Sequence, residues 1–493
     1  MDNVSSLQYF VPELILTLGV LVVLLADIFG IENKKFDAPG LLALLTAGLA
    51  FWMHLSLYSM PVSMIFENML AHDMFSTFFR GFFIASTCVV ILMTMFSREV
   101  IYLKKGEFYA ILLTVCVGMD LVAMSQDLVI IYLSLETMSL GSYMLAGFSR
   151  RVGKSEEASL KFVLYGAVST AVMLFGLTLL YGLTGSTNFT TIQQVLASTQ
   201  GSMDVIAYAI FLLIMVGVGY KIAAVPFHFW APDVYEGSPT TITAYLSVAS
   251  KGTGFALLVR LFYSTVFVED FVNNAWMEIS GIQIDWHFNI AVLSAVTMTI
   301  GNLGAIVQNN LKRLLAYSGV AHAGYLLMGI ALLNEQGLQA VIFYLVMYFF
   351  TNLAAFLVVL MMVETQDDDR ITGVRGLGIR APMVAVMMTV AMFSLVGLPP
   401  TAGFVGKYYL FTAVLNQEFY WLAIIGILNT VVSLYFYARV LKAMYFEKPA
   451  HMTKLKIQPI YIGLLTVLTL PVLYFGIWWD PLVKYARYCS EMI

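Results

Sequence analysis

Long apolar runs dominate the chain, and short polar segments separate them. A helix needs roughly 20 apolar residues to span a bilayer, at a rise of about 1.5 Å per residue. By that measure the pattern predicts about fourteen membrane-spanning helices. They are expected near residues 8–29, 37–58, 73–96, 107–125, 127–148, 158–183, 203–235, 240–266, 288–308, 313–333, 337–362, 382–416, 419–444 and 457–478.

Two of these runs are long and contain prolines that interrupt a helix. In the first, Pro226 follows Lys221 by five positions, and in the second, Pro399 and Pro400 are adjacent. Proline removes a backbone donor and clashes with the preceding turn. Backbone groups freed at membrane depth need protein or water partners, so such breaks are tolerated where they line a cavity or an ion path. We therefore expect two broken helices.

The composition places the chain in one class. Of its 493 residues 60% are hydrophobic and 11% are charged, whereas about 25% of an ordinary soluble domain is charged. The predicted fold is therefore an all-α polytopic membrane protein. The three cysteines lack zinc or iron–sulfur spacing, and neither a Walker loop nor a GxGxxG after a strand is found. We expect no cofactor or metal to bind this chain.

Basic residues occur in every second predicted loop, which is the bias of cytoplasmic loops. Both termini are therefore expected outside a plasma membrane, such as a bacterial inner membrane, with Lys484 and Arg487 in the tail as the exception. The inner loop 231–239 has acids and no base, which suits docking or proton entry. The basic loops carry Lys34, Lys35, Arg98, Lys104, Lys105, Arg150, Arg151, Lys154, Lys312, Arg313, Arg370, Arg375, Arg380, Lys442, Lys448, Lys454 and Lys456.

A weak internal repeat is visible. Residues 125–145 resemble 308–327, and each broken helix has its counterpart in the other half. Five spans from residue 107 and five from residue 288 begin on opposite sides, which predicts two inverted five-helix repeats, each with one broken helix. The predicted division is an N-terminal three-helix segment (1–106), a first repeat (107–266), a second, inverted repeat (288–444), and a C-terminal helix and tail (445–493).

Several ionisable residues lie inside predicted spans, where each costs about 2.5–3.5 kcal/mol. Glu136, Lys251 and His322 are deep, while Lys221 and Lys407 adjoin the helix breaks. One interpretation is that these charges only pair and hold the bundle together. A row of lysines facing one glutamate leaves lysines unpaired, however, which favours a role in ion movement.

The residue types favour proton transfer. Burial disfavours the ammonium form of lysine, so a buried lysine can exchange protons near neutral pH. A sodium site requires clustered oxygen ligands, and Glu136 is the only carboxylate well placed to be one of them. Lys161 lies about one turn from a helix end and could instead extend to the interface, and a lone histidine such as His322 is often a core residue.

Three segments carry a resemblance to a known family. They are PFHFWAPDVYEGSPTTITAYLSVASKGTGFALL (226–258), GNLGAIVQNNLKRLLAYSGVAHAGYLLMG (301–329) and SLVGLPPTAGFVGKYYLF (394–411). With them the chain resembles, over its whole length, the subunit N family of antiporter-like subunits in proton-pumping NADH:quinone oxidoreductase, respiratory complex I. The resemblance implies fourteen helices with two inverted repeats.

The resemblance also implies roles for residues. Glu136 and Lys221 match a switchable ion pair, Lys251 matches the central proton carrier, and Lys407 matches the site from which a proton leaves. Lysine rather than glutamate at position 407 favours subunit N among the antiporter-like subunits. The positions thought to form a hydrated central axis match His322, Lys161 and His228.

Partners follow from the same resemblance. NADH, FMN, iron–sulfur clusters and quinone are expected in other subunits, whose quinone reduction drives the protons. The expected contacts are the lipid bilayer, a neighbouring antiporter-like subunit and small membrane subunits, with no nucleic acid. Alternatives are a subunit of a multisubunit sodium/proton antiporter, a proton-translocating subunit of a hydrogenase-like or ferredoxin-driven complex, and a scaffold whose buried charges only position neighbours.

Overall fold

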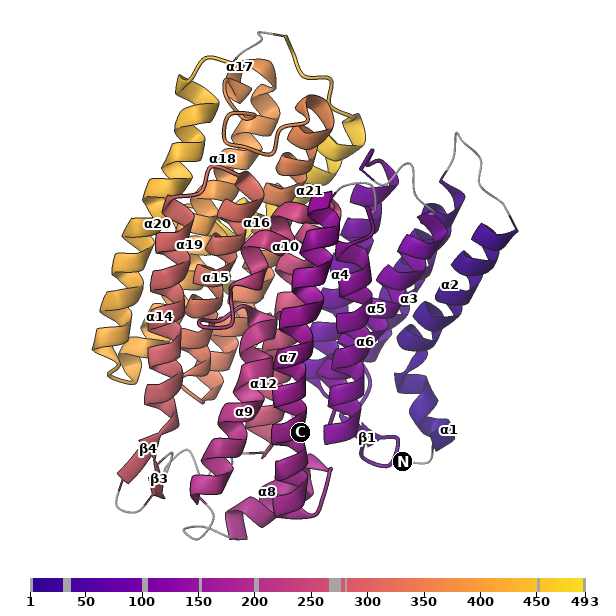
Figure 1. Cartoon of the computed structure of the whole chain (residues 1–493), viewed down its shortest axis with the longest axis vertical. Coiled ribbons are helices and arrows are strands. Elements are labelled where there is room, and N and C mark those ends of the chain that lie inside the picture. Colours follow the sequence, from indigo (N-terminus) through magenta and orange to yellow (C-terminus); the bar gives the residue numbers. More distant parts are fainter. Residues whose placement is uncertain are drawn as a thin grey trace.

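The computed structural model is a bundle of long, roughly parallel helices (Figure 1). It describes residues 3–29, 37–99, 105–149, 153–198, 204–265, 276–279, 282–449 and 453–490. The predicted all-α polytopic fold is confirmed. The strands among the described residues form two short antiparallel hairpins, both near the lower end in Figure 1.

The N-terminal helices form one side of the bundle (Figure 1). Asp73, Asp127 and Asp37 each cap the start of a helix with a carboxylate, which satisfies backbone N–H groups of the first turn. The elements are α1 (Asn3–Ser6), η1 (Leu7–Tyr9), α2 (Val11–Ile28), α3 (Ala38–Leu57), β1 (Ser63–Ile65), β2 (Leu70–His72), α4 (Met74–Met95), α5 (Lys105–Met124) and α6 (Leu128–Ala146).

The central helices contain the first break, between α9 and α10. A single span from Thr240 to Thr265 follows, and it includes a π-helical turn at its middle. The elements are α7 (Gly153–Thr184), α8 (Phe189–Ser198), α9 (Asp204–Ile222), α10 (Trp230–Gly237), α11 (Thr240–Tyr245), η2 (Leu246–Ser250), α12 (Lys251–Thr265), β3 (Trp276–Ile279) and β4 (Ile282–Asp285).

The C-terminal helices contain the second break, between α18 and α19. Of these helices, α14 and α20 lie on the side of the bundle opposite α2 and α3 (Figure 1), whereas α22 reaches the N-terminal helices through the contact between Tyr485 and Tyr58. The helices are α14 (Trp286–Ile306), α15 (Leu311–Ile330), α16 (Glu335–Gln366), α17 (Leu377–Arg380), α18 (Pro382–Val396), α19 (Ala402–Asn416), α20 (Tyr420–Phe446), α21 (Pro459–Ile477) and α22 (Asp480–Tyr488).

Each predicted span coincides with a helix, a broken helix or a helix with a π turn. Within the described residues, eleven helices are long and apolar enough to cross a membrane. Two shorter apolar helices, Ile206–Ile222 and Pro382–Val396, are the first halves of the two broken helices. The total of fourteen spans and the inverted repeats stay predictions. The predicted inner-loop position of five basic residues also stays a prediction, because they lie outside the described residues: Lys34, Lys35, Lys104, Arg150 and Arg151.

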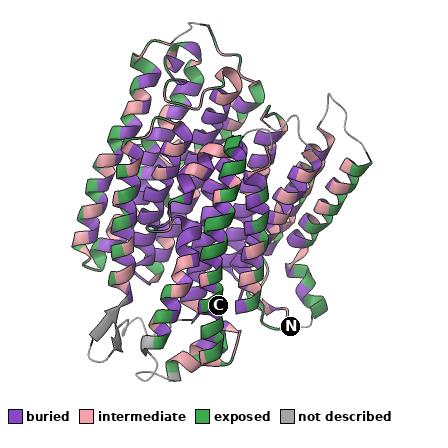
Figure 2. Cartoon of the chain, in the orientation of Figure 1, coloured by how far each residue is buried: buried purple, intermediate pink, exposed green. Residues whose placement is uncertain are grey.

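Buried residues fill the middle of the bundle, and exposed residues lie on its outer helices (Figure 2). The span Thr240–Thr265 is buried except for the half-buried Tyr263 and Ser264 near its end, and α16 is mostly buried. Two arginines are fully buried in ion pairs, Arg80 with Glu13 and Arg260 with Asp73, each at 2.7 Å. The centre of the bundle is therefore where the deep ionisable residues meet.

Candidate functional site

Lys221 lies in the last turn of α9, directly before the first break. The chain turns through Ala223, whose φ of 57° is left-handed, and reaches Pro226, which has no N–H to donate. The neighbouring Val225 N–H donates to Thr297 Oγ1 at 3.2 Å. Lys221 is 3% exposed, and its ammonium donates to Ser139 Oγ at 2.6 Å. The break therefore holds a buried lysine against α6.

Glu136 lies on α6, three residues before Ser139. Both Glu136 and Lys221 are described, and Lys221 donates to Ser139 rather than to Glu136. The glutamate is within electrostatic range of the lysine, and its buried Oε1 has no hydrogen-bond partner among the described residues. Glu136 and Lys221 thus interact electrostatically while the lysine bonds to Ser139, and the predicted switch between them stays a prediction.

Lys251 follows the π-helical turn in the middle of its span and is 3% exposed. Its ammonium donates to the Gly319 carbonyl of α15 and lies 5.7 Å from the centre of the Tyr348 ring. A Cβ on Gly319 would lie 2.8 Å from the Lys251 nitrogen, so only glycine leaves room for this approach. Lys251 therefore joins its span to α15 and α16.

His322 lies one turn beyond Gly319 on α15 and is 4% exposed. Its two ring nitrogens lie 2.7 Å from the Tyr344 hydroxyl and 3.3 Å from the Tyr437 hydroxyl. Tyr437 in turn bonds to the Ser318 hydroxyl. The imidazole interacts electrostatically with both Lys251 and Lys407. It therefore lies between the two lysines, in contact with hydroxyl groups on both sides.

Lys407 lies on α19, beyond the second break. α18 ends at Val396, so the Val396 carbonyl lacks an intrahelical partner. It accepts a 2.8 Å hydrogen bond from the Lys407 ammonium, which also donates to Thr430 Oγ1 at 3.3 Å. The ammonium lies 4.3 Å from the centre of the Tyr325 ring. Both breaks thus place a buried lysine beside irregular backbone.

The structure brings together Lys251, His322 and Lys407, and places Glu136 and Lys221 on the other side of the Lys251 span. It does not bring Lys161 to them, because this lysine pairs with Asp233 and Glu157, each at 2.7 Å, with its side chain 36% exposed. His228 is 3% exposed, and its Nδ1 has no partner among the described residues. Roles for Lys161 and His228 in proton transfer stay predictions.

Sequence reasoning missed the hydroxyl groups that contact these ionisable side chains. They are those of Tyr344 and Tyr437 beside His322, Thr430 beside Lys407, and Ser139 beside Lys221. A tyrosine or threonine inside an apolar helix is common enough that only the packing of distant helices singles these out. Asn352 was also missed. Its amide donates to Ser247 on the Lys251 span at 2.7 Å.

The acidic segment after the first break, expected as a loop, forms helix α10, and ion pairs hold it in place. Asp233 pairs with Lys161 and Arg313, while Glu236 pairs with Lys154 at 2.9 Å and Arg313 at 3.1 Å. Partial burial of Glu236 acts to raise the pKa of its carboxyl, but hydrogen bonds from Lys154 and Arg313 outweigh it and keep that pKa below the ordinary value. These contacts tie α10 to α7 and α15.

We expect α10 and the two residues after it to open more often in acid. A carboxyl whose pKa is lower in the folded chain contributes stability that is complete above its ordinary pKa of about 4.3 and is lost as the pH falls through the lower value. Amide hydrogen exchange of residues 230–239, corrected for its intrinsic pH dependence, will rise up to about fivefold in acid, since partly exposed pairs contribute about 1 kcal/mol or less. Glu236→Gln will reduce this rise. An unchanged rise in that variant would exclude Glu236 as its cause.

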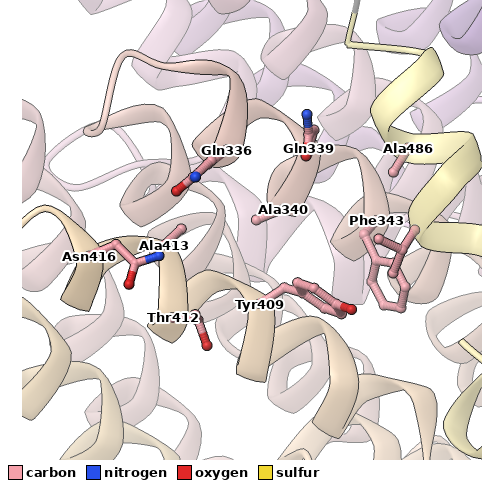
Figure 3. Close-up of a pocket in the computed structure, with 10 residues that line it drawn as sticks. Gln336, Gln339, Ala340, Phe343, Tyr409, Thr412, Ala413, Asn416 and Ala486 are labelled. Carbon is pink, nitrogen blue, oxygen red and sulfur yellow. The ribbon is translucent and has the colours of Figure 1, made fainter. Parts of the chain in front are cut away.

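A cavity of about 250 Å³ lies between the start of α16, the end of α19 and helix α22. The amides of Gln336, Gln339 and Asn416 surround it together with Tyr409, as Figure 3 shows. Apolar residues, among them Ala340, Phe343 and Val483, complete the lining, so the hollow is only partly polar; it lies against the same helix that carries Lys407.

Comparisons with known proteins agree with this geometry. Residues 125–433 match the family described as NADH:quinone oxidoreductase/Mrp antiporter, TM. The NADH-quinone oxidoreductase subunit N of Anaeromyxobacter sp. (strain Fw109-5) is 41% identical, over 99% of this chain and 97% of that protein.

Two solved structures share the fold. A chain of respiratory complex I from Thermus thermophilus with bound aureothin superposes with a TM-score of 0.78, at 28% identity, covering 96% of this chain and 98% of that one. A chain of the Mrp complex from Dietzia sp. DQ12-45-1b gives a TM-score of 0.83 at 19% identity, covering 97% and 96%, which shows the fold alone.

The identity to a subunit N extends over nearly the whole chain, whereas the likeness to the Mrp complex is one of fold. This identity over nearly the whole chain, together with buried lysines at both helix breaks, determines the family of the chain. The chain belongs to the NADH:quinone oxidoreductase/Mrp antiporter transmembrane family and, within it, to the subunit N family of NADH-quinone oxidoreductase.

Proposed function

We propose that this chain is the proton-translocating subunit N of a NADH:quinone oxidoreductase membrane arm, and that its buried Glu–Lys–His series carries the protons. One observation supports this most: Lys251, His322 and Lys407 form a buried, electrostatically linked row, in which tyrosine hydroxyls contact His322 and a threonine hydroxyl contacts Lys407. Hydroxyl and imidazole groups both donate and accept, which proton transfer requires.

The proposed mechanism uses repulsion between neighbouring cations. Two unit charges about 10 Å apart interact by about 1.7 kcal/mol at an effective dielectric of 20. At such a separation, a proton on Lys221 would disfavour one on Lys251 by more than about tenfold. When Lys221 moves from Ser139 towards Glu136, the pair closes and its repulsion on Lys251 weakens. Protons then pass along the row towards Lys407 and leave through the amide-lined cavity.

Partners and placement are part of the proposal. NADH, FMN, iron–sulfur clusters and quinone reside in other subunits, and this chain contacts a neighbouring antiporter-like subunit and small membrane subunits. It lies in a bacterial inner membrane with both termini outside. Residues 107–266 and 288–444 are the two inverted repeats, between the N-terminal segment 1–106 and the C-terminal segment 445–493. A sodium/proton antiporter subunit is less favoured, because the likeness to the Mrp complex is one of fold.

Lys407→Met tests the proposal. We expect proton pumping by the assembled complex in sealed membrane vesicles, followed with a pH-sensitive dye, to fall at least about tenfold, since removing a positioned proton-transfer group typically costs 10²–10⁴-fold. Lys154→Met is the matched control, because that lysine is 68% exposed in a surface ion pair. Normal pumping by Lys407→Met would refute the proposed function, in which protons leave by way of Lys407. Pumping that depends on sodium would favour the antiporter alternative.

A further inference from the structure

A buried carboxyl group lies outside the row of lysines, on α5. Asp120 is fully buried, and neither of its oxygens has a hydrogen-bond partner among the described residues. Burying a polar group without a partner costs several kcal/mol, and burying an isolated charge costs far more. A buried, unpartnered carboxyl group in an apolar helix therefore indicates a functional role that offsets this cost.

Two charged residues interact electrostatically with Asp120, Glu13 on α2 and Arg80 on α4, and these helices lie on the same side of the bundle (Figure 1). Arg80 binds Glu13 through two parallel hydrogen bonds of 2.8 and 2.7 Å, while its Nη1 is buried and unpartnered among the described residues. The cluster thus has two carboxyls and one guanidinium. With His54 and His72, the two buried histidines that interact electrostatically with Arg80, in their neutral form, the cluster is neutral only if one carboxyl carries a proton, and Glu13 is already paired.

Polar groups lead from this cluster to the surface at the N-terminal end. The Arg80 Nη2 donates to the Tyr9 carbonyl at 2.9 Å, and the Tyr9 ring lies 4.9 Å from that of the buried His72. His72 also interacts electrostatically with Arg80. The Tyr9 hydroxyl lies 3.5 Å from the partly exposed Ser63 hydroxyl, at the start of β1.

Other polar groups lead from Asp120 towards the centre. Cys116 lies one turn before it on α5, interacts with it electrostatically, and also interacts with Thr87 on α4. The Thr87 hydroxyl lies 2.8 Å from the Tyr245 hydroxyl, and both side chains are fully buried. Tyr245 belongs to the continuous span Thr240–Thr265, which also carries Lys251.

We propose that Asp120 is a proton-binding residue on a second polar path, which links the surface near Ser63 to the span that carries Lys251. The proposal rests on the proton-translocating function above. In each cycle the Asp120 carboxylic acid releases a proton, becomes a carboxylate, and regains a proton from the surface side. Cys116, Thr87 and Tyr245 each pass on their own proton and accept another. The Lys251 amine finally accepts the proton as an ammonium group, while Glu13 and Arg80 stay charged.

Infrared difference spectroscopy of the purified complex tests this directly. We expect a carbonyl-stretch band of a protonated carboxylic acid that is lost in Asp120→Asn and changes in intensity when NADH and quinone start turnover. Asp127→Asn is the control, because that aspartate caps α6 with hydrogen bonds to the Val129 and Ile130 amides. Its band pattern in this region should match the unmodified complex. If Asp120→Asn does not assemble, Asp120→Glu should shift the band.

Tyr245→Phe tests the link to Lys251. It should keep the Asp120 band and lose its change during turnover, because only the hydroxyl is removed. A complex without the Asp120 band, or with a band that never responds to turnover, would overturn the proposal, as would a full response in Tyr245→Phe. The proposed function fails separately, through normal pumping in Lys407→Met, whatever the Asp120 band does.

Discussion

Lys251→Ala will lower proton pumping and NADH:quinone turnover together, each by at least about tenfold, in a complex that still assembles. The Lys251 ammonium is the group that connects its own span to Gly319 of α15 and to the His322 side of the row. Alanine removes the amine and leaves no side chain that could carry a proton there. Since pumping and electron transfer are coupled in the proposed mechanism, a blocked proton path stops both.

Both activities are measured in the same membranes, with assembly checked on a native gel. Lys484→Ala is the control, because its side chain is 76% exposed in a surface pair with Asp480. Loss of assembly in Lys251→Ala would support the scaffold alternative, in which buried charges only position neighbouring subunits. Wild-type values of both activities would show that this lysine is not on the path.

Much of the site could be predicted because its signals are local in sequence. A proline five residues after a lysine in an apolar run identifies the first break, and a lysine seven residues after Pro400 identifies the second. Charges that interrupt apolar runs single out Glu136, Lys251 and His322 in the same way. These signals need no knowledge of which helices are neighbours.

The partners of these groups could not be predicted, because they come from distant helices. Which hydroxyl faces His322 depends on the rotation of α16 and α20 about their axes, and these helices are apolar on nearly all sides. The same holds for Lys221, which contacts Ser139 rather than Glu136 three residues away on α6. Asp120 did carry a local signal, a carboxylate in the run VCVGMDLVAM, but its neighbours Glu13 and Arg80 come from other helices.

Arg80→Ala will destabilise the subunit by about 3–5 kcal/mol, the usual cost of removing one partner from a buried ion pair. Glu13 would keep a buried charge without its two hydrogen bonds, at a point where α2 and α4 are joined. We expect little or no assembled complex on a native gel, and a lowered thermal midpoint for any that forms.

The double variant Glu13→Leu with Arg80→Met separates charge from packing. Replacing both partners of a buried pair by apolar side chains of similar size is often neutral or stabilising, so this variant should assemble although Arg80→Ala does not. That recovery depends on Asp120, which is left without a neighbouring cation. If Asp120 holds a proton, as proposed, it is neutral and the double variant tolerates it. If Asp120 is ionised, the double variant fails as Arg80→Ala does, so this experiment also tests the charge state of the cluster, independently of pumping.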